Sequence, residues 1–167
     1  MDRAARANDR QLVVAVPAPD AAAIQVQVLE EKGLVQLSFA HTPTVPEWTA
    51  AMDAALADRG YRAGFGFLVD QRGNRRGLTR LLIGEMVHYL HDHQARIRGA
   101  RWAVVVDEPA AYGMARACQS LAGGLPLDMA VFQGDTLEKA ERWVRRISAR
   151  NTPRGWVEVV PSRSRVV

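Results

Sequence analysis

The chain is short of cysteine and of lysine, and both shortages exclude kinds of site. Cys118 is its one cysteine, so an internal disulfide and a zinc site built from several cysteines are excluded. Among the 22 basic residues only Lys32 and Lys139 are lysines, so arginine carries almost all of the positive charge. Arginine presents planar, bidentate donors that suit phosphate and carboxylate groups. The net charge of +4 therefore permits an anionic partner, although 18 acidic residues are interspersed.

Long hydrophobic runs are also missing. No apolar stretch approaches the roughly 18–20 residues that a membrane helix needs. Basic residues precede the apolar run 12–16, but this run is shorter than the roughly 7–15 residues of a signal peptide, and Asp2 and Asp9 dilute the positive charge. We therefore expect a cytoplasmic protein with no transmembrane segment. The length of 167 residues and the 48% apolar content are typical of one globular domain.

Residues 24–40 have the alternating pattern of a β-hairpin. Apolar residues recur at every second position on both sides of Gly33, and Gln25, Gln27 and Gln36 lie between them. Gly33 supplies the positive φ that a tight turn often needs. One face of the hairpin is therefore predicted to be apolar, and the amide-rich face is predicted to meet water or a partner.

After the hairpin, the chain alternates between helices and buried strands. Three nearly unbroken apolar runs, at 64–70, 101–107 and 127–132, are typical of strands covered on both faces. Helical periodicity separates them, over 44–58, over 78–97, after Pro109 and after Asp135. The resulting order, β-β-α-β-α-β-α-β-α, requires parallel strands joined by right-handed crossovers.

This order predicts an α/β protein with a single domain over residues 24–150. We expect a mixed five-stranded sheet, with the hairpin strand at an edge followed by parallel strands, and about four helices. Residues 1–23 and 151–167 are predicted to be tails, the second of them basic. The segment 156–160, "WVEVV", is a candidate for an added strand, and a homodimer is an open alternative for its pairing.

Three segments in the second half of the chain resemble a known family. They are "WAVVVD" at 102–107, "AYGMAR" at 111–116, and the strand end "VF" followed by "LEKAERWV" at 137–144. Together with the strand–loop–helix order before them, they resemble the SpoIIAA-like family, whose domain has the STAS (STAS/SEC14-like) fold. The resemblance spans about residues 24–148 and implies a regulatory domain that binds a protein partner without catalysis.

The same resemblance raises two further expectations. In the anti-anti-sigma relatives, the loop after the third strand carries a phosphorylatable serine that opens a helix. The corresponding loop here, "DQRGNRRGLT", has no serine, and Thr79 is its only hydroxyl, so a phosphorylation switch is in doubt at this position. Other relatives resemble lipid-binding domains, which implies a small-ligand or lipid carrier as the alternative function.

Four arginines crowd this loop and the start of the helix after it, at positions 72, 75, 76 and 80. The loop follows a parallel strand, and ligands of open α/β sheets favour the crevice at the carboxyl ends of the strands. A helix N-terminus there offers free N–H groups and partial positive charge. One interpretation is therefore a site for an anionic ligand or an acidic partner, and its predicted binding residues are Arg72, Arg75, Arg76, Asp107 and Tyr112.

The other interpretation is a solvated loop whose arginines pair with Asp70 or Glu85, since surface pairs of this kind contribute only ~0–1 kcal/mol. A nucleotide P-loop is excluded, because three residues separate Gly73 from Gly77 and Leu78 stands where the lysine belongs.

Asp70 and Asp107 both end predicted parallel strands, where paired carboxylates suit Mg²⁺. A metal-assisted hydrolase or transferase that uses them is a remote alternative. In the opposing interpretation Asp107 caps the following helix and Asp70 fixes the loop. The histidines at 88, 91 and 93 do not share one helical face, so they do not predict zinc. We expect no metal, no cofactor and no catalytic residue.

The sequence therefore favours a non-enzymatic regulatory or binding domain that engages a protein partner or a small anionic ligand. No pattern of interleaved basic and aromatic residues predicts specific nucleic-acid binding. The alternative, a small-ligand or lipid carrier, predicts an apolar cavity between the sheet and the helices, with the arginines at its mouth.

Overall fold

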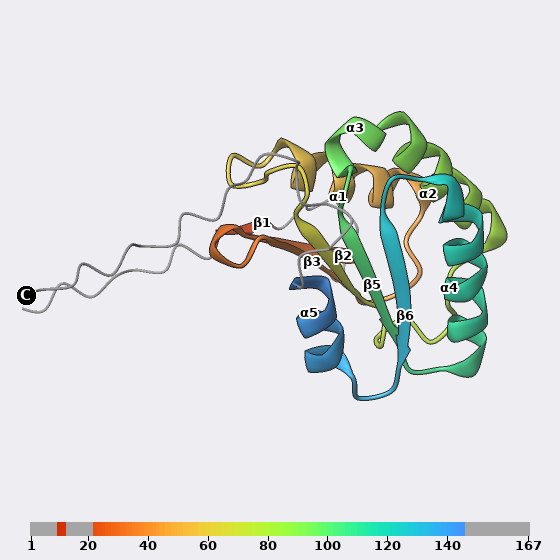
Figure 1. Cartoon of the computed structure of the whole chain (residues 1–167). Coiled ribbons are helices and arrows are strands. Elements are labelled where there is room, and N and C mark those ends of the chain that lie inside the picture. Colours follow the sequence, from red (N-terminus) through yellow and green to blue (C-terminus); the bar gives the residue numbers. More distant parts are fainter. Residues whose placement is uncertain (1–9, 13–21, 146–167) are drawn as a thin grey trace, which may run out of the picture.

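The computed structural model describes residues 10–12 and 22–145, which form one α/β unit (Figure 1). A six-stranded sheet has the order β1-β2-β3-β4-β5-β6, in which β1 to β3 are antiparallel and β3 to β6 are parallel. The strands are β1 Arg10–Leu12, β2 Ile24–Leu29, β3 Leu34–Phe39, β4 Gly66–Asp70, β5 Arg101–Val106 and β6 Asp128–Gln133.

The α/β class, the mixed sheet and the order of the five predicted strands are confirmed. The short strand β1 is an addition, and it pairs with β2, so β2 is not at the edge of the sheet. The segment 156–160, which the sequence offers as an added strand, lies outside the described residues.

The helices are α1 Val45–Ala57, α2 Arg80–Asp92, α3 Gln94–Ile97, α4 Pro109–Leu121 and α5 Leu137–Arg145, with single 3-10 turns η1 Glu30–Lys32 and η2 Ala122–Gly124. The side chain of Thr44 caps α1 and forms a capping box with Glu47. The helix predicted over 78–97 is divided at His93, whose φ of −103° and ψ of 15° interrupt the helical backbone. None of the helices in the described part of the chain is long and apolar enough to cross a membrane.

The helices cover the two faces of the sheet unequally. Alternation along β4 and β5 directs Phe67 and Trp102 into the larger core cluster with α1, α2 and α4, and directs Leu68 and Ala103 into a smaller cluster with α5. Figure 1 shows α5 separated from the group of helices that contains α2 and α4. The smaller face therefore has a single described helix over β4 and β5.

α5 lies very close to the sheet. A Cβ atom added to Gly66 would lie 2.0 Å from Cγ1 of Val144, so only glycine fits at the start of β4. The amide-rich face of the hairpin is not buried as its apolar face is: Gln25 is exposed, and Gln27 and Gln36 are half-buried. The expected contrast between the two hairpin faces is confirmed.

Candidate functional site

The ends of β4, β5 and β6 bring three loops to one edge of the sheet. We name this edge the strand-end rim and define it as the loop 71–79 with Arg80 at the start of α2, the turn 107–108 and the turn 134–136. The loop 71–79 begins as a continuation of β4, because the backbone N–H of Gln71 donates to the carbonyl of Val105 over 2.8 Å. Parallel pairing of β4 with β5 therefore determines where the loop starts.

Asn74 holds the loop together from the inside. Its side chain is 2% exposed, its backbone N–H donates to the Gln71 carbonyl over 2.9 Å, and its Nδ2 donates to the Gly77 carbonyl over 3.2 Å. The hydroxyl of Thr42 lies 2.8 Å from Asn74 Oδ1 and 2.7 Å from the Gly77 carbonyl oxygen, so it can donate to either. The loop is thus tied both to itself and to the segment after β3.

Two glycines let this loop approach its neighbours. A Cβ atom added to Gly73 would lie 2.7 Å from the carbonyl oxygen of Phe39, at the end of β3. Gly77 has a φ of +68°, and a Cβ atom there would lie 3.1 Å from the Cα of Ala111, in the first turn of α4. The loop 71–79 therefore packs closely between β3 and α4. The loop and the 107–112 segment lie together at one edge of the sheet, as the sequence predicted.

Arg72 is engaged in an ion pair within the chain. Its Nε and Nη2 donate to Asp70 over 2.9 and 2.8 Å, its backbone N–H donates to the same carboxylate, and Asp135 lies 3.6 Å from its Nη1. Burial alone would raise the pKa of Asp70, but the hydrogen bonds from Arg72 hold that pKa below its ordinary value. Asp70 therefore compensates part of the positive charge of Arg72. This is the pairing that the solvated-loop interpretation predicted for this arginine.

Arg75, Arg76 and Arg80 differ from Arg72. All three are exposed, and no hydrogen bond or ion pair joins the side chain of any of them to another described residue. Thr79, just before Arg80, is the N-cap of α2 and accepts a hydrogen bond from the Leu82 N–H over 3.2 Å. Three arginine side chains without a partner in the described part of the chain therefore lie at or beside a helix N-terminus, where the helix dipole adds to their positive potential.

Asp107 and Tyr112 are at the same edge, in different surroundings. Asp107 is exposed and Tyr112 is half-buried against the larger core cluster. The N-cap residue of α4 is Glu108, without a side-chain capping bond, so the interpretation of Asp107 as the cap of this helix is wrong. Proline at the first helical position starts α4 without needing a donor there.

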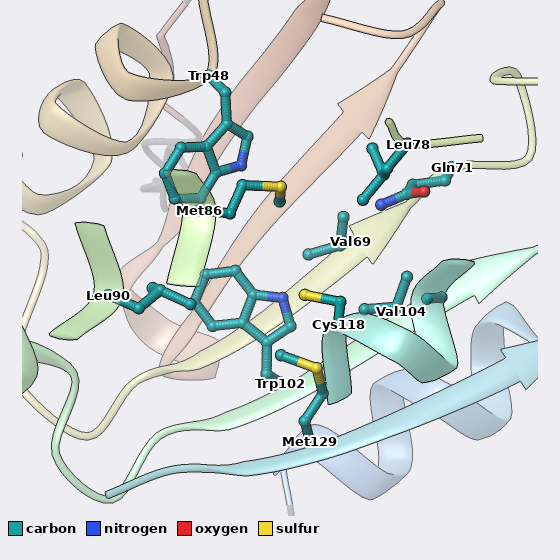
Figure 2. Close-up of a pocket in the computed structure, with 11 residues that line it drawn as sticks. Trp48, Val69, Gln71, Leu78, Met86, Leu90, Trp102, Val104, Cys118 and Met129 are labelled. Atoms are coloured by element: carbon teal, nitrogen blue, oxygen red, sulfur yellow. The ribbon is translucent and has the colours of Figure 1, made fainter. Parts of the chain in front are cut away.

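An apolar cavity lies between the sheet and the helices, below the loop (Figure 2). Its lining comes from both layers: Trp48, Val69, Gln71, Leu78, Met86, Leu90, Trp102, Val104, Ala115, Cys118 and Met129. The space open to the centre of a water molecule is about 10 Å³, which suits one water-sized group. The carrier alternative predicted a cavity in this position with arginines at its mouth, and no arginine is among these lining residues.

Two of the residues that line this cavity carry a buried polar atom without a partner among the described residues. Nε1 of Trp48 and Oε1 of Gln71 make no hydrogen bond, although the two residues are 1% and 2% exposed. Cys118 also lines the cavity, and burial raises the pKa of its thiol to about 11, so it is an uncharged thiol at neutral pH.

Metal and nucleophilic chemistry find little support in this part of the chain. Within residues 10–12 and 22–145, no three His, Cys, Asp or Glu side chains converge on a common point. Both carboxylate oxygens of Asp70 already accept hydrogen bonds from Arg72, so a metal shared with Asp107 would have to displace an ion pair.

Sequence reasoning missed Thr42, Trp48, Gln71 and Asn74. Asn74 beside Gly73 is a turn signal, but its partner Thr42 is 32 residues away, and no local pattern predicts that contact. Gln71 and Trp48 likewise come to one cavity only through tertiary structure.

Comparisons with protein-family models, with curated proteins and with solved structures found no match for this chain. The resemblance to the SpoIIAA-like family therefore stays a prediction based on the segments quoted above.

Proposed function

We propose that this chain is a non-enzymatic binding domain of the regulatory, SpoIIAA-like type, and that its strand-end rim engages an acidic protein partner. The observation that carries the proposal is the contrast within one loop. Arg72 is neutralised by Asp70, whereas Arg75, Arg76 and Arg80 are exposed and free of partners among the described residues. Free guanidinium groups retain their full capacity for bidentate hydrogen bonds to carboxylates.

The fixed backbone of the loop 71–79 supports this proposal. The buried amide of Asn74 and the close approach of Gly77 to α4 hold the backbone that carries the arginines. A surface whose backbone is ordered before binding loses less conformational entropy when the partner arrives. The loop is therefore suited to present charge to a partner.

A protein is favoured over a small anion because the free arginines are on an exposed loop. A small ligand is normally enclosed in a concave site, and the cavity below this loop is lined by apolar groups with no arginine. A carboxylate-bearing protein surface can instead meet the three arginines from outside.

The second candidate, a small-ligand or lipid carrier, is supported by the same cavity. Its position between sheet and helices suits that function, but a lipid chain needs roughly 300–1,000 Å³. The observed space of about 10 Å³ favours a much smaller molecule.

The proposal is tested by titrating isotope-labelled protein with a poly-glutamate peptide and following backbone amide shifts by NMR. We expect shifts at 72–80 and 107–112, and affinity at least about tenfold weaker in the triple variant Arg75→Gln/Arg76→Gln/Arg80→Gln. Arg59→Gln/Arg98→Gln/Arg142→Gln is the matched control, because it removes the same charge from exposed arginines outside the rim. Equal weakening in both triple variants would show binding to net charge alone and overturn the proposal. Inorganic phosphate as a second titrant tests the small-anion alternative.

A further inference from the structure

The two edges of the sheet differ in how well they are protected against pairing with another strand. At one edge β1 has three residues, Arg10–Leu12, and begins with an arginine. At the other edge β6 has six residues, and no described strand pairs with its outer side (Figure 1). Sheet edges are normally blocked by a short strand, lysine, proline or a bulge. The sequence of β6, "DMAVFQ", has no lysine or proline, its pairing with β5 is regular, and Asp128 is its one charged residue.

The hydrogen bonds between β5 and β6 show which backbone groups of β6 are used within the sheet. The N–H of Asp128 donates to the Ala100 carbonyl over 3.0 Å, and β6 then stays in regular parallel register with β5. The N–H of Gly134, just after the strand, donates to the Val106 carbonyl over 2.9 Å. Successive residues of a strand direct their backbone groups to opposite sides, so the even-numbered positions 128–134 pair with β5.

The odd-numbered residues of β6 therefore direct their N–H and C=O groups outward. These residues are Met129, Val131 and Gln133. The side chain of Gln119 agrees with this direction, because its Nε2 donates to the Met129 carbonyl over 2.5 Å. No hydrogen bond to another described residue uses the three outward N–H groups. A row of outward donors and acceptors of this kind is a template for pairing with a further strand.

The side chains of β6 are also incompletely covered. Residues 128–132 are all half-buried, whereas residues 102–106 of the neighbouring β5 are all buried. Met129 and Val131 are at the margin of the larger core cluster, and Phe132 is at the margin of the smaller one. A strand beside β6 would therefore continue the sheet and cover apolar groups on both of its faces.

We propose that the outer side of β6 is a homodimer interface, at which β6 of a second copy pairs in antiparallel orientation about a two-fold axis at Val131. This register places Val131 opposite Val131 of the second copy, and Met129 opposite Gln133. All of the outward N–H and C=O groups then meet in hydrogen-bonded pairs.

The side chains fit the same register. Ala130 lies opposite Phe132 of the second copy, so a small side chain meets a large one at the closely spaced pairs. Asp128 lies opposite Gly134, so no like charges are brought together. β6 is thus complementary to itself, as a two-fold interface requires, and this favours a second copy over an unrelated extended peptide.

This dimer does not depend on the proposed function. Antiparallel pairing of β6 places the strand-end rims of the two copies at opposite ends of the joined sheet. Both rims are then open to a partner, and binding of poly-glutamate is a separate measurement.

Sedimentation velocity of the full chain is the first test, and we expect a dimer at about 500 µM. Val131→Lys and Val131→Glu each place two like charges at the two-fold axis, and each should weaken dimerisation at least about tenfold. An equimolar mixture of these two variants should restore the dimer, because opposite charges then meet. Gln25→Lys is the control: it adds the same charge at an exposed position of β2 and should dimerise as the parent does.

Amide hydrogen exchange, followed by NMR at the same concentration, locates the interface. The amides of Met129 and Gln133 should exchange at least about tenfold faster in Val131→Lys than in the parent. The amides of Ala130 and Phe132, which are bonded to β5, should be equally protected in both chains, and they also report that the variant is folded.

Four results would overturn the proposal. The first is a parent chain that sediments as a monomer at about 500 µM. The second is a dimer that Val131→Lys leaves unchanged, which would place the interface elsewhere. The third is a mixture of the two charged variants that stays monomeric. The fourth is protection of the Met129 and Gln133 amides in a monomeric chain, which would show that another segment of the same chain covers β6.

Discussion

The inner side of the loop 71–79 is buried and packed against the fold, whereas its outer side is exposed. On the inner side Gln71 and Asn74 are each 2% exposed, and Gly77 contacts α4. On the outer side Arg75 and Arg76 are exposed and have no partner among the described residues. A loop needed only to connect β4 with α2 would not require buried amides, whereas a loop that presents charge to a partner gains from a fixed backbone.

Arg72 shows where the boundary between the two sides lies. It belongs to the same arginine cluster in the sequence, but its guanidinium is bound to Asp70 and lies near Asp135. Its role in the structure is therefore to fix the rim, and the proposed function assigns partner binding to the arginines that follow it.

The largest loss of stability is expected from Gly77→Val, which changes the buried side of the loop 71–79. A β-branched residue at a φ of +68° is strained, and its Cβ would crowd the backbone of Ala111. We expect the free energy of unfolding to fall by roughly 3 kcal/mol in urea denaturation. Gly113→Ala is the control: Gly113 is in α4, and a Cβ atom added there would meet nothing within 4 Å, so we expect a gain of about 0.5 kcal/mol. A loss in Gly77→Val no greater than that of an average surface change would show that the loop is not wedged in solution.

An intermediate loss of stability is expected from Asp70→Asn. Loss of the charged hydrogen bonds with Arg72 should cost about 1–2 kcal/mol at pH 7. Because folding lowers the pKa of Asp70, its stabilisation is fully present above the unfolded value of 3.8 and is lost as the pH falls through the lower, folded value. The difference between parent and variant should therefore shrink when urea unfolding is repeated at about pH 3. A difference that does not change between these pH values would mean that the ion pair does not form in solution.

The smallest effect on stability is expected on the outer side. Arg75→Gln/Arg76→Gln/Arg80→Gln should change the free energy of unfolding by less than about 0.5 kcal/mol, since exposed side chains without partners contribute little. Urea denaturation in parallel with the Gly77→Val variant makes the comparison directly. A loss of several kcal/mol would place these arginines in the fold and remove the contrast on which the proposed function depends.

Periodicity predicted most of the fold, because each element carries its own local signal. Alternation predicted β2 and β3, and helical periodicity over 44–58 predicted α1. The three residues of β1 are too few for a pattern, and no glycine or proline marks the division of the long helix at His93.

The site was less predictable, because its chemistry depends on contacts distant in sequence. The sequence predicted that the arginine loop and the 107–112 segment share an edge, since both follow parallel strands. It could not predict that Arg72 is paired while Arg75 is free, nor that Asn74 contacts Thr42.

The most direct test of the link between the two sides is the affinity of poly-glutamate for Asn74→Ala. This variant leaves every charge in place and removes the side-chain amide that joins Thr42 and Gly77. With folding confirmed by NMR, the account predicts binding weaker by roughly threefold or more, because the arginines must then be ordered on binding. An affinity equal to that of the parent would contradict it, since the buried side of the loop would then contribute nothing to binding.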